Sequence, residues 1–308
     1  MMMTGKSMKH SIQILFAVML TIHIIPSIGM AQNTRSSSTI SLNFGFPKFV
    51  LPEINERDAE AAMKLWTSEI ITKHQFNYEG TIFIYPDIDE LTQAMVNGQI
   101  NIAPIPAIDY LRWNKSIRLY PAVLAKIYDS VLDRFVLLVR KDSQVTRIRE
   151  LRDKLILLKQ ESSGSTLNTW LEVILHEAGL PQSHRFFSEI QRKDRESQLI
   201  FPLLLKKADC CIITEGAFQT MRELNPQLEV QLIPLVKSDS LLISNIFVYT
   251  QQLNEEARDK VTLFAMNWEE SKATEQIQTI FRFNGLVPFE ESYLENTQSL
   301  LRRYDRIQ

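Results

Sequence analysis

Residues 81–105 read TIFIYPDIDELTQAMVNGQINIAPI and predict a strand, a helix and a second strand in succession. The segment 81–85 is rich in β-branched and aromatic residues, as strands are. Asp87, with Glu90 three positions later, forms a capping box that starts a helix. Gly98 ends that helix, because glycine adopts the left-handed turn at low cost. The strand–helix–strand order predicts a parallel sheet covered by helices.

Strands and helices continue to alternate on both sides of this segment. Upstream, residues 40–46 alternate as a strand does, and a helix is predicted by the spacing of Ala59, Ala62, Met63, Trp66 and Ile70. Downstream, strands are predicted at 135–139, 155–158, 209–213, 230–235 and 243–249, and helices at 167–175, 198–207 and after Asn254. The chain therefore contains two α/β units, and the helices after 230–249 indicate a return to the first unit.

The composition is that of an ordinary globular protein. Charged residues make up 23% and apolar residues 45% of 308 residues. The net charge of -2, without a dense run of Lys and Arg, argues against a nucleic-acid partner. Cys210 and Cys211 are adjacent, and we interpret them as two small buried hydrophobic residues in a strand. No further ligands lie near them, so no metal or cofactor is expected.

The first 31 residues have the order of a secretory signal peptide. Lys6 and Lys9 precede an apolar stretch at 12–28, and residues 29–31 end with small residues before a cleavage point. Residues 32–39 then form a flexible leader. This pattern predicts a periplasmic protein. The alternative is an uncleaved membrane anchor, because the apolar stretch is near spanning length.

Seven short segments between about residues 40 and 300 form an ordered set. They are NFGFP at 43–47, DIDEL at 87–91, VNGQINIA at 96–103, FVLLVRKDS at 135–143, REL at 149–151, SSGST at 162–166 and NGLVPF at 284–289. In this order they resemble the periplasmic phosphonate/phosphite/phosphate-binding proteins of ABC transporters.

The resemblance implies an α/β protein with a type II periplasmic-binding fold, in which two α/β lobes are joined by two crossing strands and a ligand cleft lies between them. Lobe 1 would comprise 40–130 and 245–308, and lobe 2 would comprise 131–244. The crossing strands would lie near 128–134 and 238–244. The implied function is that of an extracytoplasmic solute-binding protein, a monomer that captures a small phosphonate-like or phosphate-like anion for an ABC permease.

The serine-rich start of the helix at 167–175 is the strongest candidate for a binding site. The first backbone N–H groups of a helix lack partners within it, and the helix dipole adds positive partial charge. Hydroxyl groups add donors and a glycine permits close approach, so such a segment can hold an oxyanion. In isolation it would be an ordinary N-cap. The resemblance implies phosphonate binding at Ser163, Gly164 and Ser165, with Thr166 beside them.

A second candidate is the junction of the third strand with the following helix, at Ile105, Pro106 and Ala107. Ligands of open α/β sheets bind beyond the carboxyl ends of strands, at such junctions. Glu215 follows the strand at 209–213 and could accept a hydrogen bond from an amine or hydroxyl group of a ligand.

Three places depart from the family pattern. Ile88 stands where phosphonate-binding members tend to carry a tyrosine, and they tend to carry another aromatic residue near Ile105. Arg195 with Glu196 stands where they tend to carry a histidine followed by an acid. Arg195 could form a bidentate contact with an anion. Because a site built around donors rejects ligands without matching acceptors, we expect these changes to shift which headgroup is recognised.

Two other functions remain open. The same fold can act as a sensor that signals to a membrane kinase or cyclase, and the residues do not distinguish sensing from transport. An enzyme is the third possibility. No Gly-x-Ser-x-Gly elbow and no His-Glu-x-x-His pair occurs in the sequence, so we expect no catalytic residues.

Overall fold

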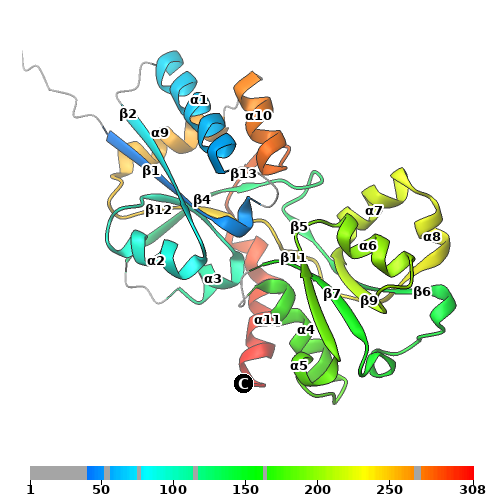
Figure 1. The fold of residues 1–308 in the computed structure, drawn as a ribbon. Coiled ribbons are helices and arrows are strands. Elements are labelled where there is room, and N and C mark those ends of the chain that lie inside the picture. The colour runs from blue at the N-terminus through cyan, green and yellow to red at the C-terminus, as the bar shows by residue number, and fades with distance from the viewer. Residues whose placement is uncertain (1–39, 52–55, 75–77, 114–116, 162–164, 267–271) are drawn as a thin grey trace, which may run out of the picture. The chain divides into compact units, whose positions relative to one another are not determined.

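The computed structural model describes residues 40–51, 56–74, 78–113, 117–161, 165–266 and 272–308. The predicted signal peptide and leader therefore lie outside the described residues. All described residues belong to one compact unit, Ser38–Gln308. Within it, helices cover two separate sheets, and each sheet with its helices forms one sheet unit (Figure 1). No helix in the described ranges has the length and apolar character that crossing a membrane requires.

The first sheet has six strands in the order β13-β4-β12-β3-β1-β2. Its strands are β1 (Ile40–Pro47), β2 (Tyr78–Tyr85), β3 (Ile102–Ile105), β4 (Leu119–Ala125), β12 (Ile246–Thr250) and β13 (Leu286–Pro288). The accompanying helices are α1 (Glu56–His74), α2 (Ile88–Val96), α3 (Ala107–Leu111), α9 (Glu255–Met266) and α10 (Lys272–Phe281). The parallel pairs β1–β2 and β1–β3 agree with the sequence prediction, whereas β12 joins this sheet antiparallel to β3 and β4.

The segment 81–105 folds as its local signals predict. Asp87 is the N-cap of α2 and accepts a hydrogen bond from the backbone N–H of Glu90 at 2.9 Å. Gly98 follows the helix with φ +75°. A Cβ atom on Gly45 of β1 would lie 2.5 Å from Leu91 of α2, so glycine lets the helix pack directly on the strand. Local capping and close packing thus fix α2 on the first sheet.

The second sheet has five strands in the order β10-β6-β9-β7-β8. Its strands are β6 (Phe135–Arg140), β7 (Leu155–Lys159), β8 (Glu189–Lys193), β9 (Cys210–Thr214) and β10 (Leu232–Lys237). The accompanying helices are α4 (Thr166–Glu177), α5 (Ser183–Phe186), α6 (Ser197–Leu204), α7 (Glu215–Leu224) and α8 (Gln227–Gln231). Cys210 and Cys211 are buried free thiols of β9 and belong to two different apolar clusters.

One predicted strand is partly wrong. Residues 230–235 were expected to be extended, but Gln227–Gln231 form helix α8 and β10 begins at Leu232. The helix follows Pro226, whose fixed φ is compatible with a helix start. Val230 is 68% exposed, so its β-branched side chain packs on no sheet. The apolar run therefore spans the end of a helix and the start of a strand.

Two short strands connect the sheets. β5 (Leu132–Asp133) and β11 (Leu241–Leu242) pair antiparallel where the chain passes between the sheets. The C-terminal helix α11 (Glu295–Asp305) packs against α4 and α3, and its Leu300 joins the apolar cluster of the second sheet (Figure 1). The end of the chain therefore contacts helices that accompany both sheets.

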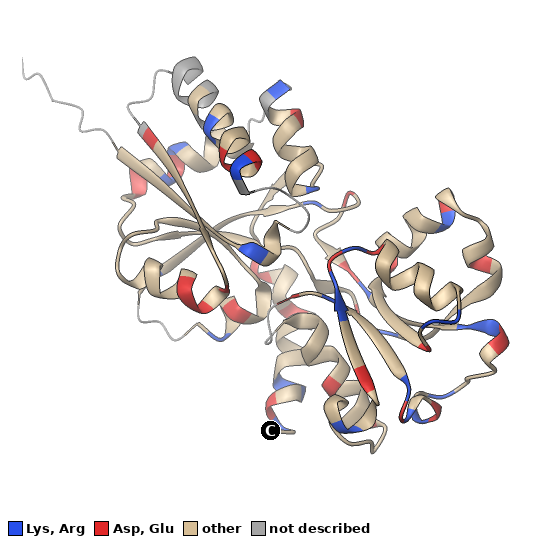
Figure 2. Ribbon diagram, viewed as in Figure 1, with Lys and Arg blue, Asp and Glu red and all other residues tan. Residues whose placement is uncertain are grey.

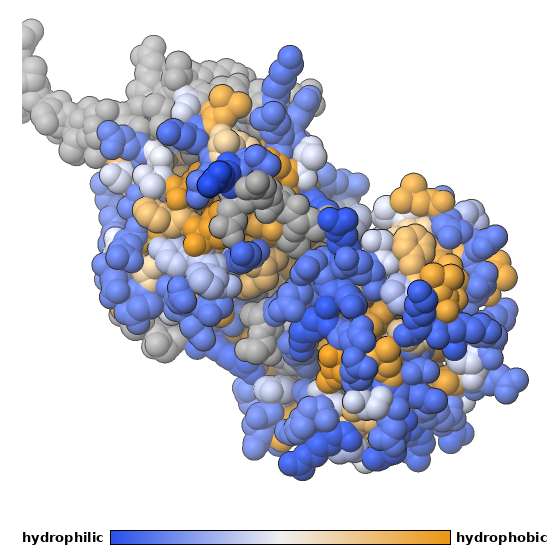
Figure 3. Space-filling view, in the orientation of Figure 1, coloured by the Kyte–Doolittle hydropathy of each residue, from blue (hydrophilic) through white to orange (hydrophobic). Residues whose placement is uncertain are grey.

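Basic and acidic residues are interspersed along the ribbon in Figure 2, in keeping with the net charge of -2. Exposed apolar side chains occur on α7, on α8 and around α6, where Figure 3 shows hydrophobic surface. They are Phe201, Leu205, Leu224 and Val230. Because these side chains are already in contact with water, truncating them should change the free energy of unfolding little.

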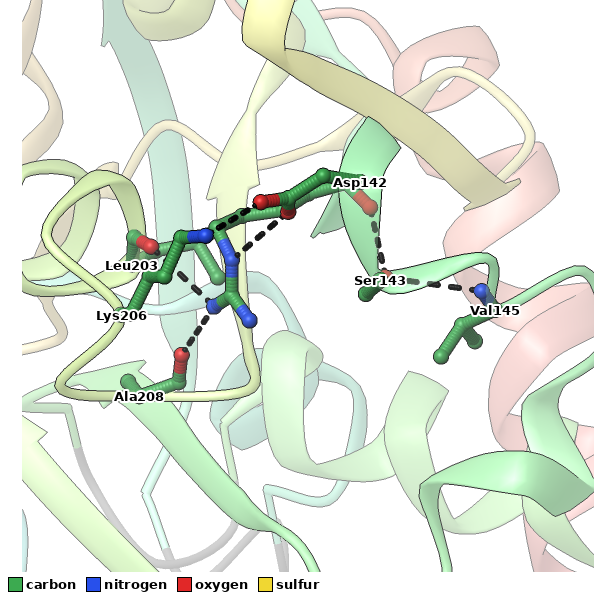
Figure 4. A network of polar contacts seen from close by, with 7 residues as sticks. Asp142, Ser143, Val145, Leu203, Lys206 and Ala208 are labelled. Carbon is green, nitrogen blue, oxygen red and sulfur yellow. Dashed lines mark hydrogen bonds and ion pairs between the residues drawn. The ribbon is translucent and has the colours of Figure 1, made fainter.

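Arg140, at the end of β6, forms hydrogen bonds with the last turn of α6 and the loop after it. Its Nη1 donates to the backbone oxygens of Leu203 at 3.3 Å and Ala208 at 2.8 Å, and its Nε donates to Asp142 at 3.1 Å. The side chain of Arg140 is 15% exposed. Lys206 pairs with the same Asp142 at 2.6 Å (Figure 4). Arg140 thus satisfies two carbonyl groups of buried residues.

Replacing Arg140 with alanine should lower the free energy of unfolding by about 1–3 kcal/mol, because the carbonyl group of Ala208 loses this donor. The carbonyl group of Leu203 keeps a hydrogen bond from the backbone N–H of Lys206. Lys206→Ala is the matched control, since Lys206 is 67% exposed and its ion pair should be worth less than about 1 kcal/mol. Urea denaturation of both variants measures the difference. Equal losses for the two variants would contradict the assigned role of Arg140.

Candidate functional site

A cavity of about 830 Å³ is lined by residues attached to both sheets. From the first sheet come Phe49, Val50, Pro106 and the segment 278–284, which comprises the last turn of α10 and the residues after it. From the second come the ends of β7 and β9 and the starts of α4 and α6. The volume falls within the range of about 300–1,000 Å³ that is typical of pockets for small organic ligands.

The start of α4 faces this cavity through Ser165, Thr166 and Leu167. Ser165 is the N-cap, and its hydroxyl group accepts a hydrogen bond from the backbone N–H of Asn168 at 3.4 Å. The backbone N–H of Thr169 bonds to the carbonyl oxygen of Ser165. The N–H groups of Thr166 and Leu167 precede this bond, so the helix itself offers them no acceptor. With the helix dipole, these amides favour an anion at this wall.

Glu161 lies beside this helix start. Burial raises the pKa of its carboxyl group, although a hydrogen bond with Ser165 and the charges of Lys159 and Arg192 act in the opposite direction. The shift shows that the surroundings disfavour the ionised form of Glu161. A protonated Glu161 can donate a hydrogen bond to a ligand oxygen, whereas an ionised Glu161 repels an anionic ligand.

Three charged side chains form a cluster on the cavity wall. Lys159 Nζ forms an ion pair with Glu196 Oε1, and Arg282 Nη1 lies 3.8 Å from Glu196 Oε2. Burial alone would raise the pKa of Glu196, but the charge and hydrogen bond of Lys159, together with the charge of Arg282, bring it below its ordinary value. Glu196 is therefore held as a carboxylate between two cations.

A turn after β4 forms another part of the wall. Tyr128 and Asp129 adopt positive φ angles of 51° and 62°. The side-chain amide of Asn284 donates to Asp129 Oδ1 at 2.6 Å. The pKa of Tyr128 is raised by burial, with a further contribution from the negative charge of Glu196. The phenol group of Tyr128 therefore stays protonated and can donate a hydrogen bond.

Four of the residues predicted to bind ligand line the cavity, namely Ser165, Thr166, Pro106 and Glu196. Ser163 and Gly164 lie outside the described residues. The site also contains residues that the sequence did not single out. They are Lys159, Glu161, Arg282 and Tyr128. Lys159 and Glu161 lie just before the serine-rich segment, so proximity could have indicated them, whereas no local signal marks Arg282.

Five predicted residues do not line this cavity. Ile105 and Ala107 are 0% and 2% exposed and pack in the apolar core of the first sheet, where Ile88 also packs. Apolar residues at a strand–helix junction are buried here because the sheet is covered on that face. Glu215 instead forms an ion pair with Lys237 at 2.6 Å, and Arg195 is exposed.

Residues 49–294 match the model of one protein family, described as the periplasmic substrate-binding protein of phosphonate ABC transporters. Among curated proteins, none matches this sequence.

Solved structures with similar folds include three bacterial proteins. A Xanthomonas citri protein solved with bound ATP has a TM-score of 0.65 at 11% identity, covering 87% of this chain and 98% of that one. PhnD1 from Prochlorococcus marinus, in complex with methylphosphonate, has a TM-score of 0.61 at 13% identity, covering 86% and 98%. The binding protein component of an ABC phosphonate transporter from Pseudomonas aeruginosa has a TM-score of 0.60 at 13% identity, covering 87% of both chains.

These likenesses bear on the fold. Together with the two α/β sheet units, the paired connecting strands and the cavity lined from both sides, they confirm the predicted type II periplasmic-binding fold.

Proposed function

Because this chain belongs to the family of periplasmic substrate-binding proteins of phosphonate ABC transporters, we propose that it captures a small phosphonate-like or phosphate-like anion and presents it to an ABC permease. The observation that supports this ligand class is the start of α4, where Ser165, Thr166 and Leu167 line the cavity and the first backbone N–H groups have no acceptor within the helix. Amides at a helix start bind oxyanions without any further cationic residue.

We also propose that the two sheet units move relative to each other when the ligand binds. Ligand contacts from both units would favour a closed arrangement, and rotation about the connecting strands would present a new surface to the permease. The lobe boundaries at 130/131 and 244/245 fit this proposal, because β5 and β11 pair close to both points.

We expect the protein to act as an exported monomer that releases its ligand unchanged. Residues 1–31 are proposed to be the export signal, and the ligand is transferred without bond cleavage.

A thermal-shift screen followed by calorimetry tests the proposed ligand class. Methylphosphonate, phosphite, phosphate, sulfate and acetate should be compared at equal ionic strength, because a ligand that binds only the folded protein raises Tm. At 100 times Kd the stabilisation should be about 2.7 kcal/mol. We expect the largest shift from a phosphorus oxyanion, with one-to-one stoichiometry. Shifts caused only by sugars or cations would contradict the proposed ligand class.

Glu161 should make the ligand-free protein less stable as the pH rises. Its folded-state pKa lies above the ordinary 4.5, so its proton is held more tightly in the folded protein than in the unfolded chain. The resulting stabilisation is complete below pH 4.5 and is lost as the pH passes the raised value. Glu161→Gln should remove this part of the pH dependence and make the protein more stable than the unmodified protein at neutral pH.

Urea denaturation from pH 4 to 8 measures this effect. Glu189→Gln is the matched control, since Glu189 is an exposed residue of β8 in the same unit. If Glu161→Gln and Glu189→Gln show the same pH profile as the unmodified protein, Glu161 is not destabilised by its surroundings.

A further inference from the structure

Two cations share one carboxylate on the wall of the cavity. Lys159, at the end of β7, is paired with one oxygen of Glu196, and Arg282 lies 3.8 Å from the other oxygen. Lys159 and Glu196 belong to the second sheet unit, whereas Arg282 follows α10 of the first unit. The cluster carries a local charge of +1, because two cations face one acid.

The position of the Glu196 carboxylate is one where negative charge is favoured. The carboxylate lies at the start of α6, and the pKa of Glu196 is lowered despite burial. Charge-assisted hydrogen bonds to Lys and Arg are about twice as strong as neutral ones. An incoming ammonium group would meet two cations here, whereas an incoming carboxylate could take over contacts that Glu196 now makes.

This cluster lies next to the proposed phosphonate site. Lys159 acts electrostatically on Glu161, which hydrogen-bonds to Ser165 at the start of α4. Lys159 therefore pairs with Glu196 of the cluster and also acts on the acid beside the start of α4. Arg192, the other cation near Glu161, donates to Asn168 at 2.9 Å and is not part of the cavity wall. Asp129, the third acid on the wall, is held by Asn284.

We propose that Lys159 and Arg282 form a second anion subsite, with Glu196 as its internal counter-ion, and that the ligand carries a carboxylate some distance from its phosphonate group. This inference rests on the proposed function and adds the substrate class. The cavity of about 830 Å³ has room for such a ligand. Arg282 is then a specificity-determining residue, which methylphosphonate would not contact because it has no carboxylate.

Isothermal titration with three ligands of similar length tests the subsite. They are 3-phosphonopropionate, propylphosphonate and 3-aminopropylphosphonate. The unmodified protein should bind 3-phosphonopropionate about 10-fold more tightly than propylphosphonate, which is the worth of one charge-assisted hydrogen bond. Arg282→Gln should abolish this preference while changing the affinity for propylphosphonate by less than about 3-fold.

Glu196→Gln should have the opposite effect to Arg282→Gln on the affinity for 3-phosphonopropionate. Removing the internal counter-ion leaves both cations for the ligand, so the affinity for 3-phosphonopropionate should rise about 10-fold. Arg195→Gln is the matched control, because Arg195 is the exposed neighbour of Glu196 and does not line the cavity. Its affinities should equal those of the unmodified protein. The Tm of each ligand-free variant verifies that it is folded.

The outcomes separate the two proposals. If 3-aminopropylphosphonate binds most tightly and Glu196→Gln lowers its affinity, Glu196 binds the ammonium group of the ligand and the inference is overturned. Equal weakening of all three ligands by Arg282→Gln also overturns it, because Arg282 then does not read the distal group. Failure of every phosphonate to bind the unmodified protein contradicts the proposed function itself.

Discussion

Replacing Thr166 with glutamate should lower the affinity for methylphosphonate by at least about 100-fold. Thr166 is the first residue of α4 and lines the cavity. Two like charges about 5 Å apart repel by about 3 kcal/mol at an effective dielectric constant of 20, which is more than 100-fold in Kd. A carboxylate in the first turn of a helix is favourable for the helix itself. Thr166 is only 7% exposed, however, so the larger charged side chain also costs folding stability, and the ligand-free Tm verifies that the variant is folded. Calorimetry on the folded variant should show loss of binding.

Thr220→Glu is the control for added charge. Thr220 is an exposed residue of α7 in the same unit, so the substitution adds the same charge away from the cavity. Its Kd for methylphosphonate should stay within about 3-fold of that of the unmodified protein, because an exposed distant charge is screened by salt. Retained affinity in Thr166→Glu, or equal loss in both variants, would contradict an anion site at α4.

The second large effect is expected from Trp170→Ala, which should lower the free energy of unfolding by about 3–5 kcal/mol. Trp170 is 3% exposed, and its ring stacks on Phe135 with centroids 5.8 Å apart. It lies in the apolar cluster that joins α4 to β6. Removing it leaves a cavity that the surrounding side chains fill only partly. Because Phe135 also lines the ligand cavity, the variant should bind phosphonates more weakly as well.

Leu224→Ala provides the comparison in the same unit. Leu224 is 83% exposed, so its truncation should change the free energy of unfolding by less than about 0.5 kcal/mol. Urea denaturation at pH 7 measures both variants. A loss below about 1.5 kcal/mol for Trp170→Ala would mean that α4 is held on the sheet by other contacts.

The fold could be predicted where its causes are local. Asp87 and Gly98 determine the bounds of α2 through capping and backbone geometry: Asp87 accepts a hydrogen bond from the backbone N–H of Glu90, and Gly98 has a positive φ. The segment around Val230 was misassigned because an apolar run does not reveal where a helix ends and a strand begins. The antiparallel insertion of β12 between β3 and β4 depends on a long-range return of the chain, which periodicity does not record.

The site could be predicted only in part. Thr166 and Ser165 were found because a helix start has a recognisable sequence and a family resemblance supported it. Ile105 and Ala107 were placed correctly at the junction of a strand and a helix, but their side chains point into the core. Of the ion cluster only Glu196 was predicted, because residues 159, 196 and 282 meet only in the folded chain.

A crystal structure of the protein with methylphosphonate is the most direct test of how the ligand is held. We expect one phosphonate in the cavity, with oxygens within hydrogen-bonding distance of the backbone N–H groups of Thr166 and Leu167. A phosphonate bound only outside this cavity, for example near Arg140 and Lys206, would contradict the proposed anion site at α4.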